Sequence, residues 1–400
     1  MLLASARNYE FIHDDQVSDF RNGVKYKGFM SCSLENVHQQ HLNTSQFDLN
    51  PIHRHPNYIS TKTPIKHPQN FAMAPYTPTT PISELIADYA SIIKGKTILT
   101  TGVTLKGLGA TFVEATAAAS PELLILAGRT ASKLDDLSKT IAAAHPGVKT
   151  RHLLVDLTSM DSVRKAAEEV NGWGDVPKID VVVNNAAVMA IPYSTTADGF
   201  ETQFAAGHLG HFLLTNLIME KILASESPRV VNISSNGHSF SPVRHYDPHF
   251  SGETYNKWAA YGQTKTANML FSLSLAQKLG SRGLQSYSVD PGLIMTTNLG
   301  NHLDFSTPDK DLASLLQAHR ERGHLEGWEF FAPIPVEVGA ATHAFAAFDP
   351  NIKASNGAHL LESRVADPYV DTVKSWARDI VEADKTWKLS EELVKQKFSY

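Results

Sequence analysis

Short apolar runs alternate with longer amphipathic stretches along most of the chain, from Lys96 to the C-terminus. Runs that are apolar throughout are typical of strands buried on both faces, and the stretches between them have the spacing of surface helices. The alternation predicts βαβ units and therefore an α/β fold: a doubly wound, mostly seven-stranded parallel sheet with helices on both faces. The predicted strands are Thr97–Thr101, Leu123–Ala127, Arg151–Val155, Val181–Val183, Arg229–Ile233, Gln285–Val289 and 358–361. The predicted helices lie near 108–119, 131–144, 159–170, 200–224 and 257–280.

The first part of the chain has a different character. Residues 1–72 are rich in His, Asn, Gln and Pro and show no sustained helical or alternating period, which predicts a disordered extension. Residues 73–95 combine a Pro/Thr lead with an amphipathic helix, and we expect the folded domain, 96–400, to follow. Whether the extension belongs to the mature protein stays open. Two His pairs in the extension have metal-ligand spacing, but no carboxylate or Cys cluster completes a site, so no metal is expected; the pairs are His38/His41 and His53/His55.

Composition excludes several classes of partner. The chain is 42% hydrophobic and 19% charged, with a formal charge of −5, so it offers no basic field for nucleic acid or an anionic membrane. No apolar run approaches the roughly 18–20 residues of a membrane span. The only cysteine is Cys32, which suits a reducing compartment. We expect a cytoplasmic protein that acts on a small-molecule substrate.

A glycine-rich loop follows the first predicted strand. Gly102, Gly107 and Gly109 surround Lys106, and Leu108 opens the next helix. Glycines let the backbone approach a pyrophosphate closely, and a helix N-terminus supplies free amide groups. The position between a strand and a helix predicts a nucleotide site, whereas a loop of this kind alone could be a purely structural turn.

Other strand ends carry further candidates for the same nucleotide. Arg129 ends the second strand at the place where a site selective for NAD would have an acid, so with Lys106 it predicts a 2′-phosphate and hence NADP(H). Asp156 could accept from the adenine amino group, and the backbone from Asn184 to Ala186 should pass close to the adenosine ribose. Each of these residues could instead be an ordinary surface cation, turn or cap residue.

Tyr261 and Lys265 lie four residues apart in a predicted helix and therefore on one face. An ammonium group beside a phenol favours the phenolate, which lowers the phenol pKa toward the range useful in acid/base catalysis. The spacing alone is also common for a packed Tyr and a solvated Lys. The rest of the chain decides between the two interpretations.

Seven motifs, in this order along the chain, resemble those of one family, the short-chain dehydrogenase/reductases. Their sequences are similar to those of retinol-dehydrogenase-like and fungal-type members. The motifs are the glycine loop, AGR, VDL, NNAA, VVNISS, YGQTK and DPGLIMTTNL. The resemblance covers about residues 95–400 and implies a Rossmann-type fold and an oxidoreductase that uses NADP(H). It implies that Tyr261 is the general acid/base, that Lys265 tunes it and binds the cofactor ribose, and that Ser235 rather than Ser234 contacts the substrate oxygen. It further implies that the segment with Pro291, Ile294 and Thr296 grips the carboxamide end of the cofactor.

Two departures from the family pattern stand out. One extra residue lies between Gly102 and Gly107, and Gly207 occupies the position of the Asn that completes the family's catalytic tetrad. These departures leave open an alternative function, an NADP(H)-binding sensor with impaired catalysis. The neighbouring His208 and His211 match the usual sequence of this segment in the family and are not expected to be catalytic.

The sequence predicts the substrate pocket in less detail than the cofactor site. Tyr261 follows Ser235 by 26 residues, so 236–258 is interpreted as an insertion, which together with a mobile lid at about 298–335 should wall the pocket. The aromatic content favours a bulky, apolar or aromatic substrate and a role in secondary metabolism, although the same side chains could pack the core. The family also implies a possible homo-oligomer formed through long helices such as 257–280.

Overall fold

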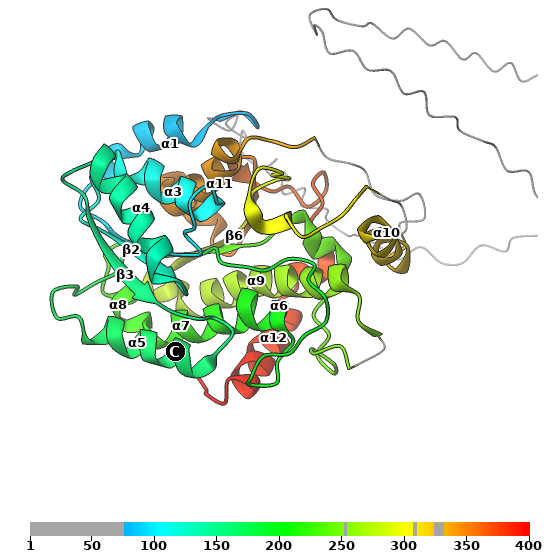
Figure 1. The fold of residues 1–400 in the computed structure, drawn as a ribbon. Coiled ribbons are helices and arrows are strands. Elements are labelled where there is room, and N and C mark those ends of the chain that lie inside the picture. The colour runs from blue at the N-terminus through cyan, green and yellow to red at the C-terminus, as the bar shows by residue number, and fades with distance from the viewer. Residues whose placement is uncertain (1–75, 252–253, 307–309, 324–331) are drawn as a thin grey trace, which may run out of the picture. The chain divides into compact units, whose positions relative to one another are not determined.

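One eight-stranded sheet organises the described part of the chain, residues 76–251, 254–306, 310–323 and 332–400 of a computed structural model (Figure 1). Its strand order is β3-β2-β1-β4-β5-β6-β7-β8. All neighbouring pairs are parallel except β7 and β8, which are antiparallel. The strands are β1 (Thr97–Thr101), β2 (Leu123–Gly128), β3 (Lys149–Leu154), β4 (Val181–Asn184), β5 (Arg229–Ile233), β6 (Gln285–Asp290), β7 (His359–Leu361) and β8 (Arg364–Val365). The predicted fold class is confirmed, and β8 is an addition to it.

The central strands are buried on both faces, as their apolar sequences require. Every residue of β1 and β5 is buried, and β1 pairs with β4 from Ile98 opposite Val181. The chain order reverses between β1 and β4, because β2 and β3 lie on one side and β5 to β7 on the other. Ligands of doubly wound sheets bind at the carboxyl ends of the strands at such a reversal.

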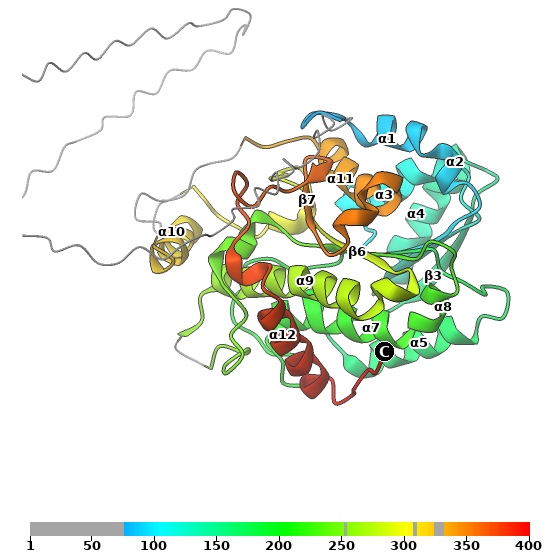
Figure 2. The same cartoon turned by 180° about the vertical axis from the view of Figure 1, so that it is seen from behind.

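Helices cover both faces of the sheet (Figures 1 and 2). The first face packs against α1 (Ile82–Asp88), α3 (Leu108–Ala117), α4 (Ala131–Ala144) and α11 (Val336–Phe348). The second face packs against α5 (Met160–Gly172), α7 (Gly210–Leu217), α8 (Met219–Leu223), α9 (Lys257–Leu279) and α12 (Ile380–Leu393). Among the described residues, no helix has the length and apolar character needed to cross a membrane.

The predicted helix 200–224 is wrong as a single element. It consists of α6 (Thr202–Phe204), a π-helical turn (Ala205–Leu209), α7 and α8. The π turn holds Gly207 at its centre, and a glycine loosens a helix by roughly 1 kcal/mol relative to Ala. Single π turns of this kind occur frequently at functional sites.

The amphipathic helix predicted after the Pro/Thr lead is divided into two. Its described residues form α1 and α2 (Ala90–Ile93), which meet at Tyr89. The Tyr89 hydroxyl donates to Asp349 Oδ2 at 2.7 Å, and this bond ties the segment to the end of α11. The expectations for residues 1–72, including their disorder and their His pairs, lie outside the described residues.

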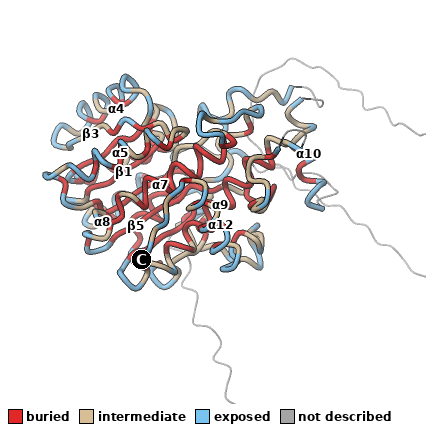
Figure 3. The backbone as a smooth tube through the Cα atoms, turned by 90° about the horizontal axis from the view of Figure 1, so that it is seen from below, coloured by how far each residue is buried: buried red, intermediate tan, exposed pale blue. Residues whose placement is uncertain are grey.

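Helix α9 lies in the interior and is buried along most of its length (Figure 3). Asn256 Oδ1 caps its first turn by accepting from the amides of Trp258 and Ala259 at 2.9 and 3.1 Å. A long helix packed between the sheet and other helices has little freedom to move. Side chains on its first turns are therefore held firmly against the carboxyl end of the sheet.

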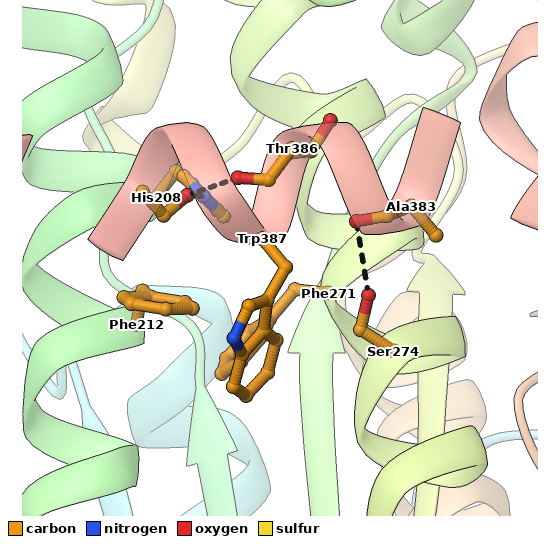
Figure 4. A pocket seen from close by; sticks show the side chains of 8 residues that line it. His208, Phe212, Phe271, Ser274, Ala383, Thr386 and Trp387 are labelled. Atoms are coloured by element: carbon orange, nitrogen blue, oxygen red, sulfur yellow. Dashed lines mark hydrogen bonds between the residues drawn. The ribbon is translucent and has the colours of Figure 1, made fainter. Parts of the chain in front are cut away.

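Helix α12 covers part of both α7 and α9, which the sequence analysis did not predict. The Trp387 ring packs edge-on against Phe212 at 5.0 Å between centroids and lies 6.0 Å from Phe271 (Figure 4). Ser274 Oγ donates to Ala383 O at 3.2 Å, and His208 Nε2 lies 2.8 Å from Ser390 Oγ. Self-association through these helices stays a prediction, and α12 leaves less of their surface available for it.

Trp387→Ala tests how far this contact stabilises the fold. Trp387 is 3% exposed, so truncation should lower the free energy of unfolding by about 3–5 kcal/mol through lost burial and the cavity left behind. Urea unfolding followed by circular dichroism measures the change. The control is Ile380→Ala in the same helix, 59% exposed, which should change it by less than about 0.5 kcal/mol. Equal losses for the two variants would contradict a specific role for Trp387.

Candidate active site

The glycine loop lies at the carboxyl end of β1, against the chain that follows β4. A Cβ added to Gly102, whose φ is +72°, would lie 2.7 Å from Ala186 Cα. A Cβ on Gly109 would lie 2.5 Å from Asn185 Nδ2. Side chains are therefore excluded at both positions, and the backbone can pass close to a ligand. Lys106, within this loop, has a left-handed φ of 65°.

The start of α3 fits an anionic group. Gly107 is the residue before the helix, with no side-chain cap for the amides of the first turn, and Leu108 begins the helix. Uncapped amides and the positive end of the helix dipole stabilise phosphate. With the tight glycine cradle beside it, this arrangement fits the pyrophosphate of a dinucleotide.

Thr101 joins the two loops, and the sequence analysis missed it. Its hydroxyl accepts from the backbone amides of Asn185 and Ala186, both at 3.0 Å. Asn185 Nδ2 donates back to the carbonyls of Thr101 at 2.9 Å and Gly102 at 3.2 Å. The loop after β4 is thus fastened to the glycine loop by four hydrogen bonds. The available signal was a Thr directly before the first glycine.

The other predicted nucleotide residues occupy the same edge of the sheet but differ in environment. Arg129 and Lys106 are exposed, and neither forms an ion pair with another described residue. Asp156 Oδ1 accepts from the amide and the hydroxyl of Thr158 at 2.9 and 2.7 Å, which makes it a turn residue with one oxygen left over. The Asn184 side chain points into the core, where it donates to Asn232 Oδ1 at 2.8 Å, so only its backbone can face a ligand.

Tyr261, Lys265 and Ser235 come together beside this cradle. Lys265 Nζ lies 5.4 Å from the centroid of the Tyr261 ring and donates to Ile233 O at 3.0 Å. Ser235 Oγ accepts from the Gly237 amide at 3.0 Å and lies close enough to the Tyr261 phenol to lower its pKa, whereas Ser234 Oγ donates to Lys265 O at 2.9 Å. Ser234 is therefore engaged in packing against α9, and Ser235 is the serine that faces the phenol. Gly237 leaves room for the ring, because a Cβ there would lie 2.7 Å from Tyr261 Cε1.

Burial dominates the protonation of this group. It raises the pKa of the Tyr261 phenol above its ordinary value, although the hydrogen bond with Ser235 lowers it. It also lowers the pKa of Lys265 to about 8, with the Asp290 carboxylate acting in the opposite direction. Burial thus dominates the net shift of the phenol pKa, and the role of Lys265 as the group that stabilises the phenolate stays a prediction. Asp290, at the end of β6, is a charged neighbour that the sequence analysis missed.

Gly207 is fixed at its position by Thr264. A Cβ on Gly207 would lie 2.5 Å from Thr264 Cγ2, closer than real atoms approach. The missing family Asn is thus matched by a methyl group that fills the space, one residue before Lys265. The neighbouring His208 is buried between Ser390 and Asn268, and burial lowers its pKa to about 4.

The segment after β6 and the predicted walls are only partly described. Ile294 packs against Gly339 of α11, where an added Cβ would also lie 2.8 Å from Pro291 O, and Thr296 is exposed. Of the predicted lid, 307–309 and 324–331 lie outside the described residues. The described part of the lid includes α10 (Asp311–Glu321). Its residues Leu315 and Ala318 belong to a buried apolar cluster with Ala190, Phe240 and Trp258, and Met189 and Leu303 pack against this cluster.

The match between Gly207 and Thr264 can be tested by substitution. Gly207→Ala alone should lower the free energy of unfolding by about 1–3 kcal/mol through overpacking, despite the helix preference for Ala. Thr264→Ser removes the methyl group. In that background Gly207→Ala should no longer be destabilising, so the double variant should be at least as stable as Thr264→Ser alone. Denaturant unfolding of the four proteins measures the coupling. Additive effects of the two changes would show that the side chains do not compete for one space.

Comparisons with known proteins agree with this geometry. The family model for short chain dehydrogenase matches residues 96–305. Human Retinol dehydrogenase 14 is 34% identical over 322 residues, which cover 76% of this chain and 87% of that protein. Oxidoreductase fscI of Fusarium equiseti is 34% identical over 242 residues, 54% of this chain and 93% of that protein. An uncharacterised protein from Mycobacterium paratuberculosis has a similar structure, with a TM-score of 0.57, 26% identity and coverage of 78% of this chain and 98% of that one. The chain therefore belongs to the short-chain dehydrogenase/reductase family and is an oxidoreductase that acts on alcohol or carbonyl groups.

Proposed function

We propose that the protein is an NADP(H)-dependent oxidoreductase that reduces the carbonyl group of a bulky apolar or aromatic molecule, or oxidises the matching alcohol. The observation that carries the proposal is the meeting of Ser235, Tyr261 and Lys265 beside a glycine cradle that accepts no side chains. A structural role alone requires no such trio. The cofactor, when bound, supplies or takes up hydride.

Each of the three side chains has one task in this proposal. The Ser235 hydroxyl donates to the substrate oxygen and polarises the carbonyl, while the Tyr261 phenol gives that oxygen its proton. A phenol whose pKa is raised by burial remains fully protonated at neutral pH, which suits a proton donor. Lys265, whose cation costs energy to bury, stabilises the phenolate left after the transfer and binds the cofactor ribose.

The phenolate must then recover a proton. Gly207 has no side chain to hold a water molecule, so we propose that the proton reaches Lys265 from solvent through water molecules ordered by backbone carbonyls, which accept hydrogen bonds but carry no proton of their own. The carbonyl of Ile233 already accepts from Lys265 and from Asn268 Nδ2, both at 3.0 Å. Both lone pairs of Ile233 O are thus used, so the carbonyl that can order such a water is that of Gly207, which keeps one lone pair beside its bond from His211 Nδ1.

The preference for NADP(H) rests on charge. Arg129 stands at the end of β2, exposed and without an ionic partner among the described residues, and Lys106 is exposed in the glycine loop. A 2′-phosphate needs such cations, whereas a ribose hydroxyl is usually met by an acid at the end of β2.

The substrate class rests on the wall. Phe240 and Trp258 form an apolar cluster with Leu315 of α10, and Arg322 Nε holds the Phe240 carbonyl at 2.9 Å. Trp258 Nε1 donates to Ser314 Oγ at 3.1 Å, which fastens α10 over the start of α9. These side chains are buried against one another, so the proposed bulky apolar or aromatic substrate rests on the composition of the segments 236–258 and 298–335. The resemblance to fungal-type members extends the proposal to secondary metabolism.

A second candidate function is an NADP(H)-binding sensor with impaired catalysis. Gly207 favours it, because the side chain that completes the family's proton relay is missing. NADPH oxidation by the purified protein, followed at 340 nm with ketones, aldehydes and quinones, separates the two. Tight NADPH binding with no turnover across the panel favours the sensor.

Tyr261→Phe tests the proton donor. The rate should fall by about 10²–10⁴-fold, the usual contribution of general acid catalysis, because the ring remains and only the hydroxyl is lost. The dissociation constant for NADPH, measured by fluorescence, should change little. Tyr287→Phe is the control, since that buried hydroxyl donates to Ile352 O at 2.8 Å away from the site. A Tyr261→Phe enzyme that keeps near-normal turnover would contradict the assignment.

Arg129→Glu tests the cofactor preference. A hydrogen bond to a charged group contributes about 1.5–3 kcal/mol, so the KM for NADPH should rise roughly tenfold or more, while that for NADH should fall. The control is Lys139→Glu, the same charge reversal at an exposed position of α4. An unchanged ratio of the two KM values would show that Arg129 does not read the 2′-phosphate.

A further inference from the structure

A buried histidine connects the π turn to the nucleotide loops. His211 lies in the first turn of α7 and is 1% exposed. Its Nδ1 lies 3.2 Å from Gly207 O, and its Nε2 lies 2.8 Å from Thr101 Oγ1. The ring therefore bridges the position of the missing Asn and the hydroxyl that joins the loops after β1 and β4.

The direction of each hydrogen bond follows from its partner. A carbonyl oxygen only accepts, so Nδ1 must carry the proton and donate to Gly207 O. In a neutral ring Nε2 is then an acceptor, and the Thr101 hydroxyl donates to it. Burial lowers the pKa of His211 to about 3, which is consistent with a neutral ring.

This direction decides what the Thr101 oxygen can do. With its hydrogen aimed at His211, its lone pairs are free to accept from the amides of Asn185 and Ala186. The other acceptor within reach is Val183 O at 3.5 Å, a longer and weaker bond. Without an acceptor at 211 the hydroxyl would lose its fixed orientation, and two of the four hydrogen bonds that fasten the loop after β4 would weaken.

We propose that His211 is a positioning residue, which orients the Thr101 hydroxyl and thereby holds the Asn185–Ala186 loop in the shape that receives the cofactor. Its other nitrogen anchors the ring on the π turn at Gly207. The proposal deepens the function proposed above and rests on it for the identity of the cofactor. The holding of the loop itself can be measured without any cofactor.

Two substitutions each keep one of the two hydrogen bonds of the His211 ring and remove the other. His211→Asn places an amide nitrogen near the position of Nδ1; it can donate to the carbonyl four residues earlier, as Asn216 does to Phe212 O at 2.8 Å in the same helix. It is too short to reach Thr101. His211→Gln extends to the position of Nε2, accepts from Thr101 and gives up Gly207.

Amide hydrogen exchange of the peptide spanning Asn185 and Ala186 is the first readout, measured on the full-length protein without cofactor. Exchange should be about tenfold faster in His211→Asn and close to wild type in His211→Gln. NADPH fluorescence titration is the second readout, with a dissociation constant about tenfold higher for His211→Asn and within about twofold of wild type for His211→Gln.

His208→Gln is the matched control. His208 is also buried, and its partners are Ser390 and Asn268, away from the loops. This variant should lower the melting temperature while leaving the exchange of the loop and the NADPH affinity unchanged. A Thr101→Val background should abolish any further effect of His211→Asn, because the hydroxyl that His211 orients is gone.

The outcomes can be told apart. Equal effects of His211→Asn and His211→Gln, or loop exchange unchanged in His211→Asn, overturn the positioning role even in an active enzyme. A wild-type protein that binds no NADPH overturns the proposed function instead, because the exchange experiment involves no cofactor. Faster amide exchange of the loop in His208→Gln would show that any destabilisation of these buried helices loosens the loop. That result would overturn the proposal.

Discussion

Burial of the Lys265 ammonium is the constraint on which the rest of the site depends. The group is 3% exposed and lies on a helix that is itself packed between the sheet and other helices. An ammonium removed from water must be compensated, and Ile233 O and the Asp290 carboxylate supply the compensation. Both lie at the carboxyl ends of neighbouring strands. The position of the cation therefore fixes α9 relative to the sheet edge, and with it the Tyr261 phenol.

The same burial changes how the acid/base pair must work. A cation beside a phenol favours the phenolate, whereas burial disfavours the charged form of each group. In this site the low-dielectric environment raises the pKa of Tyr261 and lowers that of Lys265. The phenol is therefore protonated at neutral pH, the form in which it can donate a proton.

The sequence predicted those features that depend on local pattern. The buried strands, the glycine loop before α3 and the pair Tyr261 and Lys265 follow from periodicity and spacing, and the structure brings them to one edge. The sequence could not predict the packing of α12 against α7 and α9, because that contact joins segments far apart in the chain. The π turn at Gly207 and the bonds of His211 were missed for the same reason: each depends on a tertiary partner, Thr264 or Thr101, that no spacing rule identifies.

The departure at Gly207 looks different once its partners are known. A residue lost by drift would leave a cavity or an unsatisfied group, whereas the Thr264 methyl group fills the space and His211 occupies the Gly207 carbonyl. Close packing on one side and a hydrogen bond on the other indicate an arrangement that is complete in itself. A side chain at 207 would require the Thr264 side chain, one residue before Lys265, to move. The Thr264 methyl group and the His211 ring therefore account for a glycine at 207 by packing and by hydrogen bonding.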